Sequence, residues 1–401
     1  MQELKYDVIM YGATGFTGQL TAAYLDGHAE LKGRRWAIAG RNKEKLIAVK
    51  NTLKSENVDY LHCPLENTSD VNEMVRSTKM VITTAGPFSV YGGERLLGAC
   101  AEAGTHYSDL SGEGFWQREM IDAFHDTAQS SGAKIILGGG VDSIPSDLGA
   151  YLALKQLDRI DTHRTRTKVT GMFTEYSGSF SGGTLASGAA RKKAIASGRW
   201  TMEAMRDPYI LAPEAPHNDH EEPTLDGMPD GFRVELDFAN GALLPFFMAK
   251  INAPVVRRSL FLDDNSHNTT YRECCTPSMW LKLIWLYASR GFGYPFREPI
   301  KFKPKPGEGP PTWLLKQGGF TVKVRAETDK GQRSRVTITG QGDPGYGATS
   351  KMLAELALCV VGDRPGKPNT AGVLTPSTAL GQALVNQLQQ ADGGKLMHFK
   401  A

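Results

Sequence analysis

The residues best suited to chemistry begin with a glycine-rich turn near the start of the chain, Gly12-Ala13-Thr14-Gly15-Phe16-Thr17-Gly18. The turn follows an apolar, β-rich run at Tyr6–Tyr11 and opens a helical pattern. Glycines permit a tight turn and close backbone approach, and the free N–H groups of a helix N-terminus bind a pyrophosphate. The pattern therefore indicates a dinucleotide-binding loop; the alternative is a purely structural turn.

The second β-rich run ends at Gly40-Arg41. An NAD-dependent enzyme places an Asp or Glu there to bind the adenosine ribose. A guanidinium at that point pairs instead with a 2′-phosphate, and Lys43 and Lys45 add positive charge nearby. These residues favour NADP(H) as the cofactor, whereas the alternative is a solvated basic face at the start of a helix.

Small residues close the fourth β-rich run, in the segment Thr84-Ala85-Gly86-Pro87-Phe88. They allow the backbone at Ala85, Gly86 and Pro87 to pass close to the ribose and nicotinamide. Tyr91 follows in the loop. Its hydroxyl could donate a proton or hydrogen bond to a substrate, or it could be an ordinary buried tyrosine with a satisfied hydroxyl.

Two later segments carry further candidates. Asp142 and Ser143 follow the sixth β-rich run, where they cap a helix that has Pro145 near its first turn or take part in catalysis. A hydroxyl that follows a strand can donate a proton or hydrogen bond to a substrate, so Tyr91 and Ser143 are candidate donors, with Asp142 to orient Ser143. Tyr176, Ser181 and Thr184 are candidate substrate-binding residues.

Metal catalysis and cysteine chemistry have no support in the sequence. The chain contains no HExxH motif and no paired-carboxylate spacing, so we expect no metal. Its five cysteines include no CxxC pair, which indicates neither a zinc site nor a disulfide framework. Cys100 lies on an apolar helical face and is expected in the core.

The elements that position these residues alternate β-rich runs with helical patterns up to about residue 150, as in a parallel, doubly wound sheet of Rossmann type. The expected strands are Tyr6–Tyr11, Trp36–Ala39, Asp59–His62, Met80–Thr84, His106–Asp109 and Lys134–Leu137. The expected helices include Gly18–Leu25, Lys43–Leu53 and Gly93–Ala103. We predict an NADP(H)-binding domain over residues 1–150.

Longer β-type runs after residue 150 indicate a second α/β domain with a largely antiparallel or mixed sheet, over residues 151–345. Its expected strands are Arg166–Phe173, Phe232–Phe238, Phe320–Thr328 and Ser334–Gly340, and 213–229 is predicted to be a solvated loop. Helical patterns at Tyr346–Val361 and Pro376–Leu388, the second capped by Thr375 or Ser377, form a C-terminal part over residues 346–401 that returns to the first domain.

Length and charge exclude other classes. The chain has 401 residues, 46 Lys plus Arg and 43 Asp plus Glu, a formal net charge of +3 that gives no sign of a nucleic-acid partner. The start of the chain resembles no secretory signal. We expect a cytoplasmic protein, with reversible contact to membranes or lipid surfaces through a Trp- and Leu-rich segment at residues 279–292; an ordinary buried helix or a homodimer contact is the alternative for that segment.

Together these segments resemble the saccharopine dehydrogenase-like oxidoreductases and, within them, the trans-acting enoyl reductases. The matching text runs the length of the chain and comprises YDVIMYGATGFTG, AGRN, TTAGPFSVYG, CAEAGTHYSDLSGE, VDSIPSDLG, SGGTLASG, KPGEGP and GDPGYGATSKMLAE. The resemblance implies a Rossmann domain that binds NADP(H), a middle α/β domain and C-terminal helices that pack back on the first domain. It places the dinucleotide loop at Gly12–Gly18 and the phosphate-binding arginine at Arg41.

Two positions depart from the family pattern. Val141 replaces an aromatic residue, and Arg95 replaces a proline. Both are expected near the nicotinamide, so the identity of the substrate cannot be taken directly from the family.

We predict an NADPH-dependent reductase of a conjugated carbon–carbon double bond in a polyketide-like or lipid-like substrate, either a small molecule or a carrier-bound acyl group. One alternative is a saccharopine-type imine reductase or amino-acid dehydrogenase, for which Arg191, Lys192 and Lys193 would supply the cationic pocket. Another is a non-catalytic protein that senses NADP(H) or binds a lipid surface.

Overall fold

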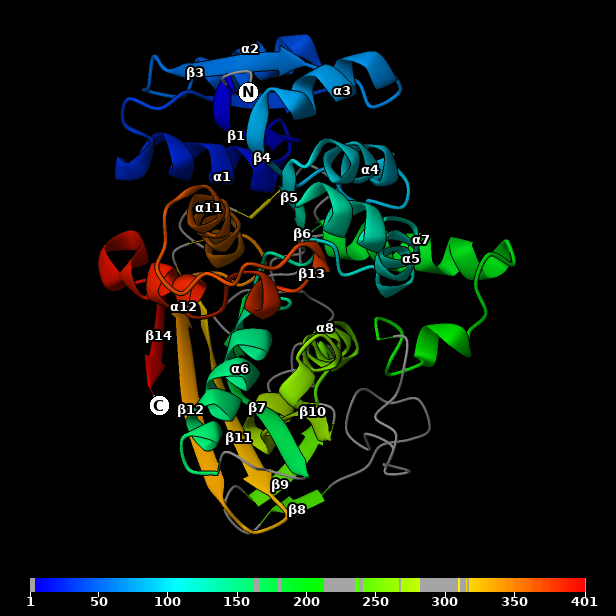
Figure 1. The fold of residues 1–401 in the computed structure, drawn as a ribbon, viewed down its shortest axis with the longest axis vertical. Coiled ribbons are helices and arrows are strands. Elements are labelled where there is room, and N and C mark those ends of the chain that lie inside the picture. Colours follow the sequence, from blue (N-terminus) through cyan, green and yellow to red (C-terminus); the bar gives the residue numbers. More distant parts are fainter. Residues whose placement is uncertain are drawn as a thin grey trace.

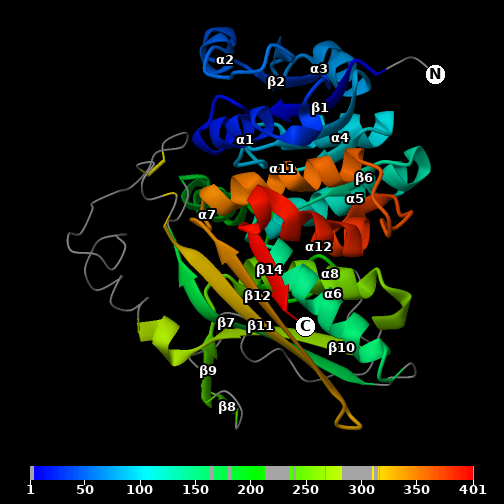
Figure 2. The same cartoon turned by 90° about the vertical axis from the view of Figure 1, so that its left-hand side faces the viewer.

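The structure, a computed structural model, describes residues 4–161, 166–178, 182–212, 235–237, 241–266, 268–281, 309–310, 315 and 317–400. Within these residues the strands form two sheets, each of seven strands. Figures 1 and 2 show the first sheet and its helices at one end of the long axis and the second sheet at the other. Two C-terminal helices, α11 (Gly347–Val361) and α12 (Pro376–Gly394), lie between the sheets in both views.

All strands of the first sheet are parallel, in the order β13-β6-β5-β4-β1-β2-β3. The order β3-β2-β1-β4-β5-β6 is that of a doubly wound dinucleotide-binding sheet, which confirms the predicted Rossmann architecture. The strands are β1 (Tyr6–Tyr11), β2 (Trp36–Gly40), β3 (Val58–His62), β4 (Thr78–Thr83), β5 (His106–Ser108), β6 (Lys134–Ile136) and β13 (Gly372–Leu374). We did not predict β13, which pairs with β6.

Alternating side chains of β1 explain why both faces of this sheet are covered. Val8 and Met10 are buried in one hydrophobic cluster with residues of α1 (Phe16–Asp26) and α11. Ile9 and Tyr11 belong to a second cluster, on the other face, with residues of α3, α4 and α5. The remaining helices around this sheet are α2 (Lys43–Lys50), α3 (Thr68–Arg76), α4 (Gly93–Ala103), α5 (Gly114–Ser131) and the short η1 (Ala29–Leu31).

The second sheet is mixed, as predicted, in the order β14-β12-β11-β7-β10-β9-β8. β7 and β10 pair in parallel, whereas the other neighbouring strands pair antiparallel. The strands are β7 (Thr167–Ser177), β8 (Glu235–Asp237), β9 (Gly241–Pro245), β10 (Thr269–Cys275), β11 (Gly319–Thr328), β12 (Arg333–Gln341) and β14 (Met397–Lys400). The helices between residues 144 and 266 are α6 (Ile144–Asp158), α7 (Gly182–Ala196), η2 (Ala204–Arg206), α8 (Ala249–Phe261) and η3 (Asp264–Ser266), and α7 lies beside α5 of the first domain (Figure 1).

The C-terminal part contributes a strand to each sheet, because β13 joins the first and β14 the second. Thr375 caps α12 in a capping box with Thr378, as predicted for Thr375. The domain boundary expected at residue 150 falls inside α6, which continues from the first sheet to the second.

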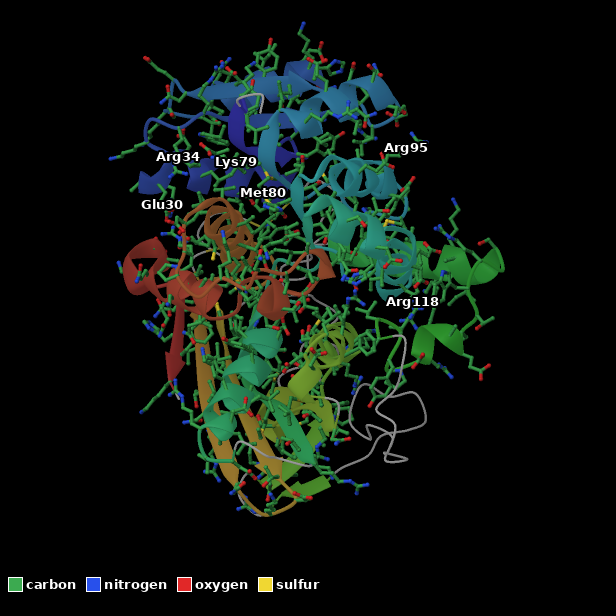
Figure 3. All side chains as sticks on the ribbon, viewed as in Figure 1. Glu30, Arg34, Lys79, Met80, Arg95 and Arg118 are labelled. Atoms are coloured by element: carbon green, nitrogen blue, oxygen red, sulfur yellow. The ribbon has the colours of Figure 1, made fainter. Side chains whose placement is uncertain are left out.

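A buried carboxylate ties the C-terminal helices to the first domain. Glu355 of α11 accepts hydrogen bonds from the Tyr24 hydroxyl (2.5 Å) and from Gln387 Nε2 of α12 (2.6 Å), and His28 Nε2 lies 3.3 Å away. The hydrogen bond to Glu355 raises the pKa of His28. Nearby, Glu30, which is labelled in Figure 3, pairs with Arg364 in the segment between α11 and α12.

Within the described ranges, no helix is both long enough and apolar enough to cross a membrane. Of the segment at 279–292, only residues 279–281 are described, and the loop predicted at 213–229 lies wholly outside the described residues. Cys100 is buried in α4, as expected for a core residue.

Candidate active site

The glycine-rich turn between β1 and α1 is shaped by the backbone of its neighbours. Gly12 has a φ of +80°, and a Cβ there would lie 3.0 Å from the amide nitrogen of Ala85. A Cβ on Gly18 would lie 2.2 Å from the carbonyl oxygen of Gly12. Both positions therefore need glycine for the fold itself. At Gly15, by contrast, the nearest atom to an added Cβ is the carbonyl oxygen of Gly12, at an ordinary 3.5 Å.

The N-terminus of α1 is open to an anion. The helix starts at Phe16, its N-cap is Gly15, and no side chain caps its first N–H groups. No acidic residue lies in its first turn. Uncapped N–H groups and the positive end of the helix dipole together bind a phosphate, so Thr14, Gly15, Phe16, Thr17 and Gly18 fit the pyrophosphate of a dinucleotide.

Phe16 also packs against C-terminal residues. Its ring meets that of Tyr346 edge-on, with centroids 5.0 Å apart and an interplanar angle of 81°. A Cβ on Gly309 would fall 2.0 Å from the Phe16 ring, so the backbone at residue 309 also lies against it. Gly309 and Tyr346, which belong to the motifs KPGEGP and GDPGYG, thus lie next to the dinucleotide loop at Phe16.

Arg41 and Tyr91, which are far apart in sequence, meet in space. Arg41 follows β2 and is exposed. Its guanidinium carbon lies 5.1 Å from the centroid of the Tyr91 ring, in a cation–π arrangement. Tyr91 therefore lies on the β1–β3 side of the sheet, where the adenosine half of a dinucleotide binds in this fold.

The segment after β4 lies next to the glycine-rich turn. The Thr84 hydroxyl donates to the carbonyl of Gly12 (3.3 Å), and the Ala85 amide donates to the Thr83 hydroxyl (3.1 Å). Gly86-Pro87 is a cis peptide. Ala85, Gly86 and Pro87 therefore border the crevice between β1 and β4, at which the strand order reverses and ligands bind in such sheets.

Glu113, which we did not single out, holds this segment in place. Its carboxylate accepts from the amides of Phe88 (2.9 Å) and Ser89 (3.3 Å) and from the Ser89 hydroxyl. It also accepts from the Ser187 hydroxyl of α7, at 3.1 Å. Glu113 ends the family motif CAEAGTHYSDLSGE, but the sequence gives no sign that four donors converge on this carboxylate.

Asp109 is a second buried carboxyl group at the end of β5. It accepts from the Tyr107 hydroxyl (3.0 Å) and from the amides of Ser111 (3.0 Å) and Gly138 (3.2 Å). Burial raises its pKa to about 7. Because it is completely buried and its oxygens are occupied, Asp109 fixes the loops after β5 and β6.

The loop after β6 carries Asp142 and Ser143. Asp142 is partly buried, and among the described residues no hydrogen bond or ion pair to its carboxyl group is found. Burial raises the pKa of Asp142 to about 6. A carboxyl group with that pKa is protonated in a substantial fraction of molecules near neutral pH and can donate a proton.

Ser143 has different surroundings from those expected. It stands at the N-cap of α6 with Pro145 in the first turn, as predicted, but its side chain makes no capping hydrogen bond, so that part of the prediction is wrong. Its hydroxyl is buried and has no partner among the described residues. Ser143 Oγ would lie 2.5 Å from a Cβ on Gly138, which places it inside the loop.

Asp147, in the first turn of α6, is structural. It accepts from the Ser259 hydroxyl, from the Ser377 amide (2.7 Å) and from the Ser377 hydroxyl (2.8 Å). These bonds join α6 to α8 and to the start of α12.

The predicted substrate-binding residues are only partly described. Tyr176, near the end of β7, packs in an aromatic cluster with Phe246 (centroids 6.0 Å apart) and Phe247 (5.7 Å apart). Directly after the strand, at Gly178, an added Cβ would lie 2.9 Å from Asp343 Oδ1. Ser181 and the side chain of Thr184 lie outside the described residues.

The two departures from the family pattern do not both lie near the nicotinamide side. Val141 is buried, and its amide donates to the Thr349 hydroxyl of α11 (3.2 Å). Arg95, on the outside of α4, points to the loop after β3, with its guanidinium 3.5 Å from the carbonyl of Leu65 (Figure 3). The expected position of Arg95 is therefore wrong, because α4 turns this side chain toward the β3 side.

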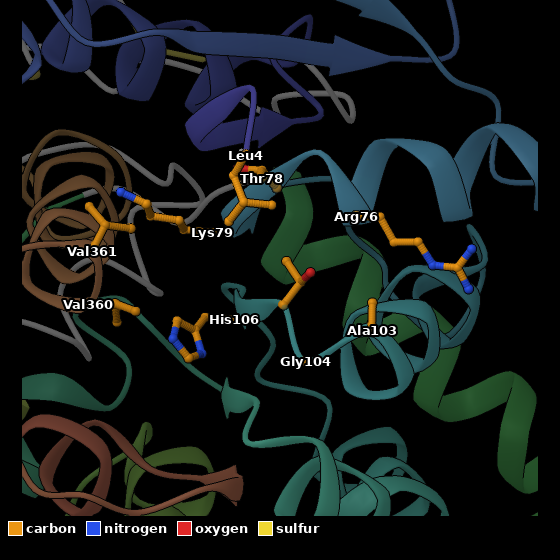
Figure 4. Close-up of a pocket in the computed structure, with 10 residues that line it drawn as sticks. Leu4, Arg76, Thr78, Lys79, Ala103, Gly104, His106, Val360 and Val361 are labelled. Atoms are coloured by element: carbon orange, nitrogen blue, oxygen red, sulfur yellow. The ribbon is translucent and has the colours of Figure 1, made fainter. Parts of the chain in front are cut away.

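A separate cavity of about 410 Å³ lies at the opposite edge of the first sheet (Figure 4). Its lining includes Thr78 and His106, which begin β4 and β5. Ligands of such sheets bind at the carboxyl ends of the strands, and Lys79 of this cavity is already paired with Asp7 (2.6 Å). We therefore do not assign the cofactor or the substrate to it.

Comparison with known proteins agrees with this geometry. Residues 8–136 match the family model of the saccharopine dehydrogenase NADP-binding domain. A relative from Mycobacterium tuberculosis, named among the trans-acting enoyl reductases, is 34% identical, and the match covers 96% of each chain. The trans-acting enoyl reductase of Mycobacterium ulcerans is 30% identical, again over 96% of each chain.

Solved structures match at the level of the fold. Apo saccharopine dehydrogenase (L-Glu forming) from Saccharomyces cerevisiae superposes with a TM-score of 0.52 at 11% identity, covering 99% of this chain and 100% of the other. Homospermidine synthase from Legionella pneumophila, in complex with NAD, gives a TM-score of 0.50 at 11% identity, covering 99% and 92%.

Proposed function

Because this chain belongs to the trans-acting enoyl reductases, within the saccharopine dehydrogenase-like, NADP(H)-dependent oxidoreductases, we propose that it reduces a conjugated carbon–carbon double bond in a polyketide-like or lipid-like acyl substrate. The observation that carries the proposal is the match to these relatives along nearly the whole chain. The substrate is an enoyl thioester, either small or attached to a carrier.

The second domain supports an apolar substrate over an amino acid. A saccharopine-type reaction needs cationic side chains that bind substrate carboxylates. Arg257 donates to the carbonyls of Pro208 (3.0 Å) and Tyr271 (2.8 Å), so this buried guanidinium serves the backbone.

Arg258 is engaged in the same way, since it donates to the carbonyls of Leu211 (2.9 Å) and Val373 (2.6 Å). Lys192 and Lys193 of α7 are exposed. Near the end of β7, by contrast, the rings of Tyr176, Phe246 and Phe247 form an apolar cluster.

When bound, NADPH supplies a hydride to the β-carbon of the enoyl group. The negative charge then develops on the thioester oxygen, and the α-carbon must take up a proton. Asp142 is our candidate for the group that delivers this proton. Its carboxyl group follows β6, in the half of the sheet that receives the nicotinamide in this fold, and its raised pKa keeps part of it protonated.

Glu113 connects the loop after β4, which we assign to the cofactor, with α7, which we assign to the substrate. It holds the backbone at residues 88 and 89, next to Pro87, and the Ser187 hydroxyl of α7 on one carboxylate. Since α7 begins at Gly182, within the Ser-Gly-Gly-Thr motif, we assign Glu113 a positioning role.

The test is a direct comparison of substrates. The purified protein is given NADPH with short and long 2-enoyl thioesters of coenzyme A and of a carrier protein, and in parallel with a 2-oxo acid plus an amine. We expect NADPH oxidation with enoyl thioesters only. With NADPH deuterated at the nicotinamide C4, the label should reach the β-carbon, and in D₂O a solvent deuteron should reach the α-carbon.

Two outcomes would contradict the proposal. Turnover of the oxo acid and amine without turnover of the thioesters would indicate the saccharopine type. Tight NADPH binding without turnover of any of these compounds would indicate a protein that senses the cofactor.

A further inference from the structure

The contact between Arg41 and Tyr91 links two loops that the chain supplies separately, one after β2 and one after β4. The Arg41 guanidinium carbon lies 5.1 Å from the centre of the Tyr91 ring, and the Tyr91 side chain is 41% exposed. In the described part of the chain, no carboxylate forms an ion pair with Arg41. Its charge is therefore available to a ligand.

The backbone holds Tyr91 in this place. Its amide donates to the carbonyl of Pro87 (3.1 Å), and the chain turns back immediately afterwards at Gly92, which has a φ of +77°. Two residues after Tyr91, the amide of Gly93 donates to the carbonyl of Phe88 (3.0 Å). Glu113 fixes Phe88 in turn, so the loop presents Tyr91 from a rigid base.

The backbone of Arg41 is anchored as well. Its carbonyl oxygen lies 3.2 Å from Nε2 of His62, at the end of β3. An exposed arginine with a free side chain loses much rotamer freedom when it binds a ligand. A ring on which the guanidinium already lies reduces that loss and leaves the planar N–H donors available at the guanidinium edge.

We propose that Tyr91 is a positioning residue for cofactor selection, whose ring holds the Arg41 guanidinium ready for the 2′-phosphate of NADPH. This rests on the assignment of Arg41 to that phosphate, a part of the proposed site. It gives Tyr91 a task at the adenosine end of the cofactor, distinct from the proton donation considered from the sequence. The property that the ring controls is the preference for NADPH over NADH.

The experiment measures binding by fluorescence or calorimetric titration with NADPH, NADH and 2′,5′-ADP, which carries the 2′-phosphate but no nicotinamide. Tyr91→Leu removes the ring and should weaken NADPH and 2′,5′-ADP about two- to fivefold, the range for an exposed cation–π contact. NADH affinity should stay close to that of the parent. Tyr91→Phe keeps the ring face and should keep the NADPH-to-NADH ratio.

A double-mutant cycle with Arg41→Ala tests whether the ring acts through the guanidinium. Tyr91→Leu should have no further effect on 2′,5′-ADP binding once Arg41 is alanine. Thermal unfolding of each variant shows that the loop still folds. Equal weakening of NADH and NADPH by Tyr91→Leu would overturn the proposal, because the ring would then contact a part common to both cofactors.

Two further outcomes separate this proposal from those on which it rests. If Tyr91→Phe weakened NADPH and 2′,5′-ADP as much as Tyr91→Leu does, the hydroxyl and not the ring face would matter, and the proposal would be overturned. If Arg41→Ala left the NADPH preference intact, the Arg41 assignment would fail, and the role of Tyr91 with it. The substrate proposal is tested independently by the thioester assay.

Discussion

At the carboxyl ends of its strands, the first sheet has polar groups without protein partners in one half and hydrogen-bonded carboxylates in the other. On the β1–β3 side, the N-terminus of α1 is uncapped and Arg41 is exposed without an ion pair among the described residues. On the β4–β6 side, Asp109 and Glu113 are buried, and each accepts at least three hydrogen bonds. The first half is built to receive a ligand, and most of the second is satisfied by the protein.

Asp142 departs from the pattern of its own half. It is a carboxyl group on the β6 side, but it is partly exposed and has no hydrogen-bond partner in the described part of the chain. A polar group that the fold leaves unsatisfied at a ligand-binding edge is a better candidate for function than one with many donors. The comparison thus distinguishes groups that bind ligands from groups that hold loops.

The largest expected effect is on turnover. Asp142→Asn removes the acidic proton at nearly constant shape, so kcat should fall on the order of 10²- to 10³-fold while NADPH affinity is retained. Asp147→Asn is the matched control, since Asp147 is a buried carboxyl group with three donors. It should lower the free energy of unfolding by about 1–3 kcal/mol and spare the chemical step.

The pH profile sharpens the same prediction. Because the pKa of Asp142 is raised to about 6, its protonated fraction falls as the pH rises through 6. Turnover of the parent should therefore decrease above that pH, and the decrease should be missing in Asp142→Asn. A parent profile that is flat from pH 5 to 8 with rate-limiting chemistry would remove Asp142 as the donor.

The next effect is on the cofactor. Arg41→Ala should weaken NADPH about 10- to 150-fold, which corresponds to about 1.5–3 kcal/mol for a hydrogen bond to a charged group. NADH binding should hardly change. Lys43→Ala, at an exposed neighbouring position, is the control and should have a much smaller effect. Equal losses for both cofactors would mean that Arg41 does not bind the 2′-phosphate.

A pair of glycines tests the open face of the turn. Gly15→Val should fold normally, because its Cβ meets nothing closer than 3.5 Å, yet weaken NADPH about 5- to 100-fold by intruding on the pyrophosphate. Gly18→Val should instead destabilise the protein, since its Cβ would lie 2.2 Å from the Gly12 carbonyl oxygen. Titration and thermal unfolding of both variants separate the two effects; unchanged NADPH affinity in Gly15→Val would contradict the loop assignment.

The smallest effect is expected at Ser143. Ser143→Ala removes a buried hydroxyl without a partner, so stability should change by no more than about 0.5 kcal/mol or rise slightly. Turnover should remain within about twofold of the parent, because the hydroxyl is enclosed in the loop. A loss of turnover like that expected for Asp142→Asn would return Ser143 to the role first considered for it.

Local patterns predicted most of the first sheet. β1 and α4 have the expected bounds, because a buried parallel strand and a helix between glycines each leave a continuous signal. β13 was missed because three residues, Gly-Val-Leu, carry no period and join the sheet only through pairing with β6. A strand of three residues is too short to be recognised from its sequence.

The candidate site also has some features that local sequence predicts and others that only the folded chain shows. The glycine-rich turn and Arg41 were found because their function depends on local sequence. The convergence of four donors on Glu113 and the contact of Tyr91 with Arg41 depend on loops brought together by the sheet, so the sequence could not show them. Asp142 was noticed only as a neighbour of Ser143, because burial and missing partners are properties of the folded chain.

The pairing of β13 with β6 also determines when the first sheet can be completed during synthesis of the chain. During synthesis, β6 emerges more than 200 residues before β13, so for most of that time one edge of the nucleotide-binding sheet has no partner. An unpaired edge strand is open to pairing with other chains. A fragment that ends near residue 150 would retain this exposed edge permanently, so we expect the cofactor-binding half to need the C-terminal part to keep β6 from pairing with other chains.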